Sequence, residues 1–284
     1  MDMHTEITAF LADKGITYDT VTLNGHSVVV AHTHSGKDIS IIPVGVSSIN
    51  TEDASLQAEH LSTSIQAIIS RTGERPFVVT QDRWKSQTEM IRSRLLAHLE
   101  IYRQIYARNC EIRRIDKQTA ADFLKANHSY GDAACRYRYG LFLKRHTGHN
   151  AGTKELEPGT LVAVATFSNA RKWIKEDKTI RSYEWTRYAS LPGVRLSGGM
   201  GKLLKAFIEE VKPDDIMTYA DLEWSDGKVY EALGFLLEGQ KTPVMFSIDL
   251  EDWSRSPIMK EGESIRYFQN SGSNKYRLKL TDYQ

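Results

Sequence analysis

Three glycines stand where a predicted strand gives way to a predicted helix. Between a strand expected over 182–189 and a helix expected over 202–211 lies the segment Leu196, Ser197, Gly198, Gly199, Met200, Gly201 and Lys202. Glycine lets the backbone turn so that successive N–H groups point into open space. The N-terminus of the helix adds partial positive charge there. These seven residues are therefore a candidate site for a phosphate or pyrophosphate.

Two side chains capable of proton transfer follow the glycines. Asp221 comes directly after a strand predicted over 215–220, and Tyr230 lies in a short helix predicted over 228–233. A carboxylate at the carboxyl end of a strand can bind an amine or move a proton beside a cofactor crevice. A phenol can donate a proton to a departing thiolate. Structural roles stay open for both, as a helix cap for Asp221 and as core packing for Tyr230.

Other candidate residues lie in predicted loops and strands. His128 ends a helix expected over 119–127, where its imidazole can act as a base or simply cap the helix. Arg187 is expected on the same strand face as Trp185, where it can meet a phosphate or Asp221. Trp224 and Ser225 follow the strand that carries Asp221 and can stack on a base or anchor the loop.

Residues 109–250 resemble the GNAT acyltransferase superfamily in two motifs. The glycines of 198–201 match the turn after the family's fourth strand, and 230–235 match a helix of the form LYExxGF after its fifth strand. The resemblance implies that 196–202 hold the pyrophosphate of acetyl-CoA or another acyl-CoA, and that Tyr230 is the acid. The turn departs from the family pattern Q/R-x-x-G-x-G/A, because Leu196 takes its first position when Gly199 and Gly201 are its glycines.

A narrower resemblance rests on six short motifs in a fixed order. They are 127–131, 139–142, 166–168, 184–189, 219–221 and 227–235. This order resembles the Mom-type DNA-modification proteins of phage, and equally the C-terminal domain of phage and bacterial proteins related to homing or very-short-patch-repair-like nucleases. It implies a nucleobase amine as acyl acceptor. The candidate catalytic residues are then Asp221, Tyr230 and His128, and the candidate substrate-binding residues are Arg187, Tyr139, Ser168, Trp224 and Ser225.

The pattern predicts a mixed α/β fold with two domains and an extension. Residues 1–108 resemble a degenerate restriction-endonuclease-like α/β domain, with a hairpin expected over 28–31 and 38–44 and a long helix over 84–106. Residues 109–250 form the GNAT-like domain, and 251–284 are expected to pack on it. Nucleases of that type hold a divalent ion with acids on both hairpin strands. Strand 28–31 carries no acid, so we predict neither a metal site nor nuclease activity, and we expect His32 and His34 to be surface residues.

Composition limits the remaining classes. The 284 residues carry a net charge of +1 and two cysteines, with no CxxC zinc pair. The mean hydropathy is -0.43, and no apolar run reaches the roughly 18 residues of a membrane span. We therefore expect a cytoplasmic protein without a membrane partner. Nine Lys and Arg against four acids between 83 and 117 favour an alternative function, a non-catalytic nucleic-acid-binding accessory protein with an inactive nuclease domain.

Overall fold

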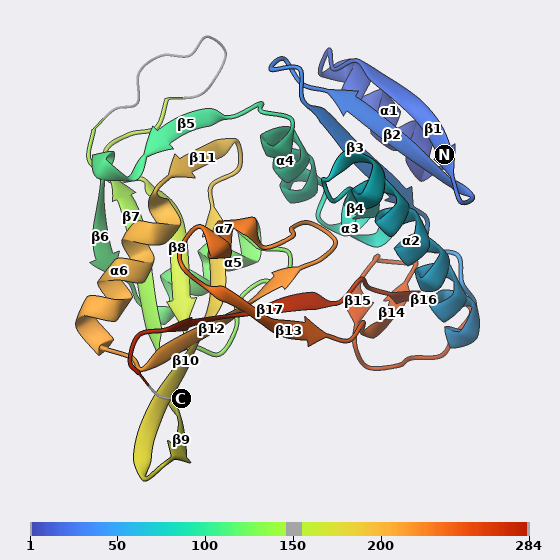
Figure 1. The fold of residues 1–284 in the computed structure, drawn as a ribbon. Coiled ribbons are helices and arrows are strands. Elements are labelled where there is room, and N and C mark those ends of the chain that lie inside the picture. Colours follow the sequence, from blue (N-terminus) through green and yellow to red (C-terminus); the bar gives the residue numbers. More distant parts are fainter. Residues whose placement is uncertain (1, 146–154, 283–284) are drawn as a thin grey trace. The chain divides into compact units, whose positions relative to one another are not determined.

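The structure is a computed structural model that describes residues 2–145 and 155–282, and the chain forms two compact units (Figure 1). Unit 1 comprises Met1–Glu100, Ala220–Lys228 and Gly239–Asn274, and unit 2 comprises Ile101–Tyr219, Val229–Glu238 and Lys275–Gln284. Both units combine helices with sheets that contain parallel and antiparallel pairs, as the expected α/β class requires. Among the described residues, no helix is long and apolar enough to span a membrane.

Unit 1 contains a four-stranded sheet. Helix α1 (Met3–Asp13) precedes the strands β1 (Tyr18–Leu23), β2 (His26–His32), β3 (Asp38–Val44) and β4 (Phe77–Thr80), which lie side by side in that order. The first two pairs are antiparallel, and β3 and β4 run parallel. The predicted hairpin is therefore confirmed. β1 escapes the sequence prediction because it is an edge strand whose side chains are nearly all exposed.

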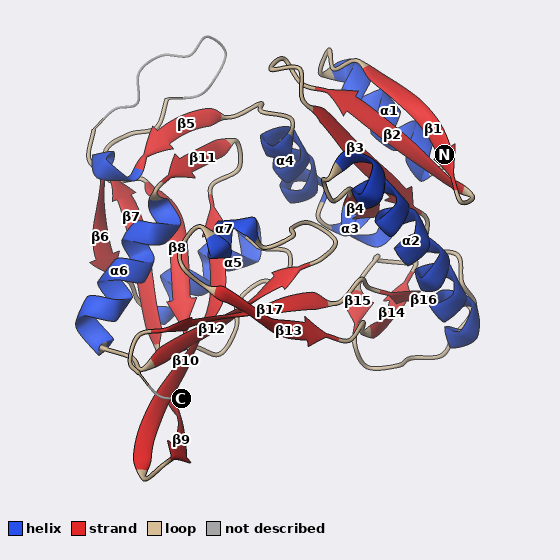
Figure 2. Ribbon diagram, in the orientation of Figure 1, coloured by secondary structure: helices blue, strands red, loops and turns tan. Residues whose placement is uncertain are grey.

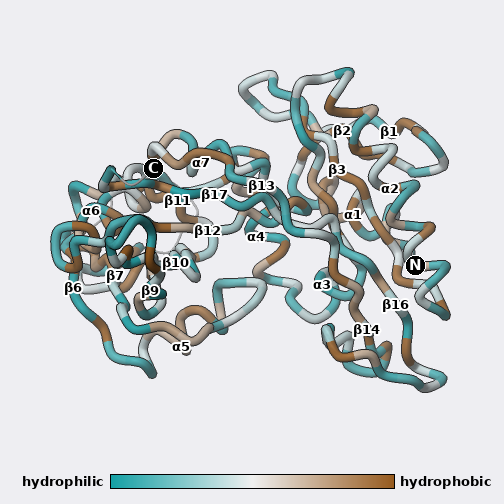
Figure 3. Tube along the Cα trace, turned by 60° about the horizontal axis from the view of Figure 1, so that its bottom comes forward, coloured by the Kyte–Doolittle hydropathy of each residue, from teal (hydrophilic) through white to brown (hydrophobic). Residues whose placement is uncertain are grey.

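The core of unit 1 lies between this sheet and helix α2 (Thr51–Thr72). Asn50 begins the helix by accepting the N–H of Asp53 at 2.8 Å, and Gly73 ends it at φ 73°. The core contains Val28, Ile42, Val44, Leu61, Ile65, Ile68, Val78, Ile248 and Phe268. Apolar stretches of β3 and β14 are brown in Figure 3.

A three-stranded sheet explains why part of the C-terminal extension belongs to unit 1. Its strands are β14 (Met245–Asp249), β15 (Arg255–Ser256) and β16 (Ile265–Gln269). Ile248 and Phe268 from this sheet enter the core of unit 1. We expected 251–284 to pack as a whole on the GNAT-like domain, but residues 251–274 lie in unit 1.

The long helix expected over 84–106 is wrong. The structure has α3 (Gln81–Ser86), α4 (Thr88–His98) and then the strand β5 (Arg103–Tyr106), followed by a 3-10 turn, η1 (Ala107–Asn109). Gln87 separates α3 from α4, because its φ of -127° is not helical. Glu100, which follows the end of α4, has a left-handed backbone with φ 65°. Residues 103–106 pair in parallel with β11 (Val194–Ser197), and this tertiary pairing outweighs their helical spacing.

Unit 2 is organised around a larger sheet. The strands lie in the order β13 (Leu236–Lys241), β17 (Ser273–Lys279), β12 (Asp215–Asp221), β10 (Lys178–Ser190), β8 (Leu161–Phe167), β7 (Tyr137–Leu143) and β6 (Cys110–Arg114), with β9 (Arg171–Lys175) paired to β10 (Figure 2). The helices are α5 (Lys117–Asn127), α6 (Gly199–Val211) and α7 (Lys228–Glu231). α6 follows the fourth and α7 the fifth of the strands β6, β7, β8, β10 and β12, which is the order that the resemblance implies.

α5 and α6 cover opposite faces of this sheet. On one face Ala120 and Leu124 of α5 pack against Val164 and Ala189. On the other, the ring of Phe207 in α6 stacks on Phe167, with 3.9 Å between the centroids. Side chains of β10 therefore reach different helices according to the face on which they lie.

A buried cluster of charges stabilises unit 1. The Arg83 guanidinium, 3% exposed, lies 2.7 Å from Glu223 and 3.3 Å from Asp221. Beside it, Arg255 pairs with buried Asp82 at 2.6 Å. Burial raises the pKa of Glu223. The cluster ties α3 to residues 221–223, at the end of β12, and to β15.

Replacing Arg83 by Met should destabilise unit 1 strongly. The change removes the nearest cation from both carboxylates and leaves Glu223 with Arg255 at 3.7 Å. Breaking a buried pair by removing one partner costs about 3–5 kcal/mol. The free energy of unfolding from urea titration measures the effect. Arg113→Met is the matched control, because its partner Glu111 is exposed and such pairs contribute about 0–1 kcal/mol. A loss below about 1 kcal/mol for Arg83→Met would contradict the assigned role.

The pH dependence of unit 2 offers a second test. Arg277, whose hydrogen bonds outweigh the effect of burial, and Lys275 lower the pKa of Glu238 from 4.5 to about 2. A carboxyl whose pKa is lower in the folded state stabilises above its unfolded value, and this contribution is lost as the pH falls from 4.5 through 2. Glu238→Gln should therefore flatten the fall in melting temperature over that range, whereas Glu251→Gln should leave the profile unchanged. Identical profiles for the two variants would refute this.

Candidate functional site

The strand β10 contains one extra residue in its middle. Trp185 pairs with Phe167 on β8, but Arg187 pairs with Thr166, so Thr186 forms a β-bulge. The bulge moves each side chain that follows it to the opposite face of the sheet. Trp185 and Tyr188 lie on one face, with their rings 6.2 Å apart, whereas residues 187 and 189 lie on the face of α5. The expectation that Arg187 shares a face with Trp185 is therefore wrong.

The neighbouring strands β10 and β12 part at the same level. They pair in parallel only from Ser182 to Glu184, opposite Asp215 to Met217. One further link joins them, from the Thr218 hydroxyl to the carbonyl of Trp185 at 3.2 Å. Beyond this level the carbonyls of Thr186 and Arg187 also accept side-chain donors, from the Arg187 guanidinium and the Trp185 indole. The two strands therefore part, and side chains replace part of the lost ladder.

The glycine turn begins α6 earlier than the sequence indicates. The helix starts at Gly199, three residues before the expected 202, and the short strand β11 precedes it. Gly198 takes the cap position with φ 75°, in the left-handed region that favours glycine. Gly198 thus becomes the first glycine of the turn. With Gly198 in that position Arg195 stands three residues before it, but Met200 takes the place of the second glycine, so the turn departs from the pattern Q/R-x-x-G-x-G/A in this register too.

Three backbone amides are open at this turn. The first hydrogen bond of the helix runs from the N–H of Lys202 to the carbonyl of Gly198 at 3.0 Å. The amides of Gly199, Met200 and Gly201 come before it, and they have no acceptor in the part of the chain that the structure describes. Gly198 is exposed. The turn therefore has the donors and the positive helix end that a diphosphate needs.

The side chains around these amides are engaged by the protein. A Cβ on Gly199 would lie 2.7 Å from Cδ2 of buried Leu196. The Ser197 hydroxyl accepts from the Gln104 amide. The Lys202 ammonium donates to the carbonyls of Ala107 and Cys110 at 2.9 and 2.5 Å. The backbone, and not the side chains of Leu196, Ser197 or Lys202, is therefore the binding surface of the turn.

Tyr230 lies in the same region of unit 2. Its half-buried ring packs on Trp185 and Tyr276, with centroids 6.1 and 5.7 Å away. Leu233, one turn later, lies 3.3 Å from where a Cβ on Gly201 would stand. The turn that follows α7 therefore lies beside the first turn of α6, which brings Tyr230 and the glycine turn into the same region.

A second group of predicted residues gathers on the α5 side of the sheet. His128 ends α5, and its Nδ1 accepts the N–H of Tyr130 at 3.1 Å. The Arg187 guanidinium donates to the carbonyl of Gly131 at 3.1 Å in the same loop. The Ser168 hydroxyl accepts the N–H of Glu184 at 2.9 Å. These three predicted residues hold the loop after α5 and the strand β10 in place.

The remaining predicted residues serve other parts of the structure. The Tyr139 hydroxyl, in the core of unit 2, donates to Glu210 at 2.8 Å. Asp221, Trp224 and Ser225 belong to unit 1. Burial acts to raise the pKa of Asp221, but the charge of Arg83, the N–H of Glu223 and the charge of Arg94 together lower that pKa. Trp224 is 1% exposed, and Ser225 accepts the N–H of Gly227 at 3.1 Å.

The basic segment 83–117 is divided between the two units. Residues 83–94 lie in unit 1 and 103–117 in unit 2. Seven of the nine cations have a carboxylate or aromatic partner within their unit, and these are Arg83, Lys85, Arg92, Arg94, Arg108, Arg113 and Arg114. Four of these seven, Arg83, Lys85, Arg113 and Arg114, have a carboxylate partner, and the other three contact aromatic rings and keep their charge.

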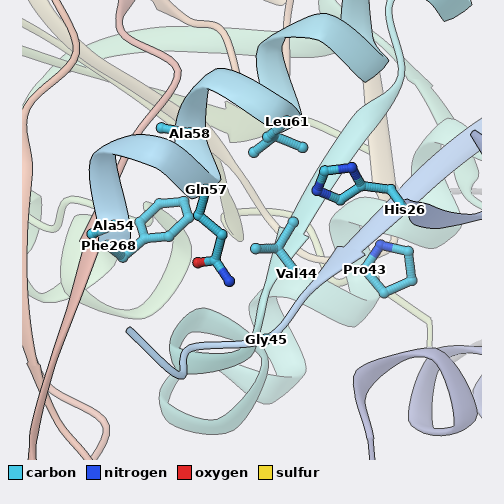
Figure 4. Close-up of a pocket in the computed structure, with 9 residues that line it drawn as sticks. All are labelled: His26, Pro43, Val44, Gly45, Ala54, Gln57, Ala58, Leu61 and Phe268. Carbon is cyan, nitrogen blue, oxygen red and sulfur yellow. The ribbon is translucent and has the colours of Figure 1, made fainter. Parts of the chain in front are cut away.

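A small pocket lies in unit 1. Its volume is about 80 Å³, and its walls are His26, Pro43, Val44, Gly45, Ala54, Gln57, Ala58, Leu61 and Phe268 (Figure 4). His26 is held by Ser64 at 2.9 Å, and burial lowers its pKa. His32, which we expected on the surface, is half-buried between Asp19 and Asp38 at 3.3 and 2.8 Å.

Neither Tyr188 nor the β-bulge that directs it toward α6 was predicted from the sequence. The Tyr188 hydroxyl lies 3.1 Å from the position of a Cβ on Gly199, directly beside the first turn of α6. Burial, and then the neighbouring Cys110 and Tyr230, raise the pKa of this phenol. The aromatic spacing of 183, 185 and 188 was the available signal, but a regular strand would have put Trp185 and Tyr188 on opposite faces.

Adding one methyl group at Gly199 should disturb this site. Gly199→Ala forces Leu196 and Tyr188 aside, and overpacking of this kind costs about 1–3 kcal/mol. Thermal unfolding measures the loss. Gly239→Ala is the control, since nothing lies within 4 Å of the position that its Cβ would take. Equal melting temperatures for the two variants would mean that the turn is looser than described.

Comparisons with known proteins give weak structural similarity. No family model and no curated protein matches the sequence. The Salmonella typhimurium protein yncA with its cofactor acetyl-CoA is 13% identical, covering 62% of this chain and 96% of its own, with a TM-score of 0.35. Arabidopsis thaliana NAA60 in complex with a bisubstrate analogue is 8% identical, with 61% and 99% covered and a TM-score of 0.36.

A third similar structure is an N-acetyltransferase from Staphylococcus aureus. It is 13% identical, covers 61% of this chain and 99% of its own, and has a TM-score of 0.31. Similarities at this level do not identify a substrate or an activity.

Proposed function

We propose that unit 2 is a GNAT-type N-acyltransferase that transfers an acyl group from acyl-CoA to an amine. One observation carries the proposal: the open amides of Gly199, Met200 and Gly201 lie in the same region as the phenol of Tyr230. A diphosphate and a thioester sulfur are the two ends of the reactive arm of acyl-CoA. The residues present suit both ends.

The parting of β10 and β12 supports the same donor. The arm of coenzyme A that joins the diphosphate to the sulfur contains two amide groups. We infer that such amides bind the main chain of β10 and β12 beyond Glu184 and Met217, where the ladder between these strands ends. Main-chain groups of the glycine turn, of β10 and of β12 would thus hold the donor, and contacts at three places would also fix its orientation.

In the proposed reaction Tyr230 is the acid that protonates the departing sulfur. The amine nitrogen attacks the thioester carbonyl carbon, a C–N bond forms, and the C–S bond breaks. Tyr230 donates its proton to the departing sulfur, and the amine loses one proton to a base, so the products are an amide and a thiol. The packing of its ring against Trp185 orients the phenol for this step.

The acceptor is proposed to enter beside the loop after α5. Glu184 makes no hydrogen bond through its carboxylate within the described residues, and its charge acts on Arg187. In the same loop Asp132 Oδ1 is buried without a hydrogen-bond partner. Two carboxylates suit an amine, and we propose Glu184 as the base that accepts its proton. Asp221 and His128 have structural partners, and this reaction does not use them.

The finer proposal, from the Mom-like motif order, is that the amine belongs to a nucleobase. A base in a duplex must then be flipped out to reach the site. Incubation with radiolabelled acetyl-CoA and single-stranded DNA should label the DNA more than a polyamine or a lysine peptide. Labelling of the amines alone would retain the acyltransferase and reject the nucleobase.

Replacing Tyr230 by Phe tests the proposed reaction itself. The variant keeps the ring but lacks the acid, so kcat for acetyl transfer should fall about 100-fold or more while acetyl-CoA still binds. Release of free thiol measures the rate, and calorimetry measures binding. Tyr18→Phe, on the exposed strand β1, is the control. No binding of acetyl-CoA at tens of micromolar, or an unchanged kcat, would overturn the proposal.

A further inference from the structure

The Tyr188 side chain has no role in the reaction proposed above. It lies on β10, two residues after the bulged Thr186, and the bulge turns it to the face of Trp185. Without the extra residue it would point to α5, as Arg187 and Ala189 do. Its presence on the face of the glycine turn is therefore a consequence of the bulge.

Trp185 holds Tyr188 and Tyr230 at similar distances. The indole ring meets Tyr188 edge-on at 6.2 Å and Tyr230 edge-on at 6.1 Å. The indole N–H donates to the carbonyl of Arg187 at 3.0 Å, which fixes the ring itself. Both phenols thus contact the indole ring of Trp185, which is itself held by a hydrogen bond.

The Tyr188 hydroxyl is available for a ligand. It stands 3.1 Å from the position of a Cβ on Gly199, so only glycine there leaves room for it beside the helix start. It makes no hydrogen bond to any residue that the structure describes. The side chain is only half-buried. A hydroxyl so fixed, and still unpaired, can donate to an incoming acceptor.

We propose that Tyr188 is a donor-binding residue that hydrogen-bonds an amide carbonyl in the arm of acyl-CoA. The inference rests on the proposed function. A donor with its diphosphate at Gly199 to Gly201 and its sulfur at Tyr230 must run its arm between them. Tyr188 contacts both ends, through Gly199 and through Trp185. The carbonyls of the arm are acceptors, and the phenol supplies the matching donor.

The proposal distinguishes Tyr188 from Tyr230 by the step that each affects. The hydrogen bond of Tyr188 exists before and during the reaction, so its loss should raise KM and leave kcat unchanged. Tyr230 acts on the departing sulfur, so its loss should lower kcat. The two tyrosines share a neighbour in Trp185, and the same Tyr→Phe change in each removes one oxygen atom.

Calorimetry with two probes tests this inference. Coenzyme A carries both the diphosphate and the arm, whereas ADP carries the diphosphate but lacks the arm. Tyr188→Phe should weaken coenzyme A about 3- to 10-fold, the range for one neutral hydrogen bond, and leave ADP unchanged. Tyr230→Phe should leave both affinities within twofold of the unsubstituted protein. Melting temperatures within two degrees of the unsubstituted protein show that the fold is kept.

The outcomes separate this inference from the proposed function. If the unsubstituted protein binds coenzyme A and Tyr188→Phe binds it equally well, Tyr188 has no part in donor binding and the acyltransferase stands. If Tyr188→Phe weakens ADP as much as coenzyme A, the phenol acts on the diphosphate turn and the assignment to the arm is overturned. If the unsubstituted protein binds neither probe, both proposals fail.

Discussion

A single extra residue in β10 sets the geometry of the candidate site. Where Thr186 interrupts the pairing with β8, the strand turns its later side chains over, and near the same level its ladder with β12 ends. A regular strand would direct Tyr188 toward α5. The bulge therefore accounts for the presence of Tyr188 in the aromatic group around Trp185. Bulges of this kind are often found next to active sites.

The glycine turn adds a second constraint, which is steric. Gly198 has the backbone conformation that caps α6, and Gly199 lacks the Cβ that would collide with Leu196. The first three amides of the helix are left without acceptors, as at any helix start, but here they adjoin a phenol and the end of a second helix. A helix start alone would be an ordinary anion site. Its proximity to Tyr230 is what suggests a substrate with two polar ends.

The two units differ in how their charges are used. In unit 1, Arg83 and Arg255 neutralise buried carboxylates, and Asp221 is one of these. In unit 2, the carboxylate of Glu184 is not used by any hydrogen bond among the described residues. A carboxylate in a buried ion pair cannot lose its partner without destabilising the fold, whereas a carboxylate that accepts no hydrogen bond can receive one from a substrate. Glu184 is therefore the better candidate for chemistry.

Local patterns predicted most elements, and tertiary contacts explain the failures. Helix α2, the hairpin β2–β3 and the strands β7, β8 and β10 followed from sequence because their apolar residues recur at helical spacing or form short strand-like runs. β5 was predicted as helix because its partner β11 lies 91 residues later in the chain, from Arg103 to Val194. The glycine turn and Tyr230 were predicted from composition and family resemblance. Tyr188 was not, since no residue type announces a bulge at Thr186.

Hydrogen exchange on addition of coenzyme A tests the central claim most directly. If the parted strand and the glycine turn together hold the donor, the amides of 186–188 and 199–201 should both exchange more slowly, while those of β2 and β3 should not change. Protection confined to unit 1, or unchanged exchange in both segments at saturating coenzyme A, would contradict the account.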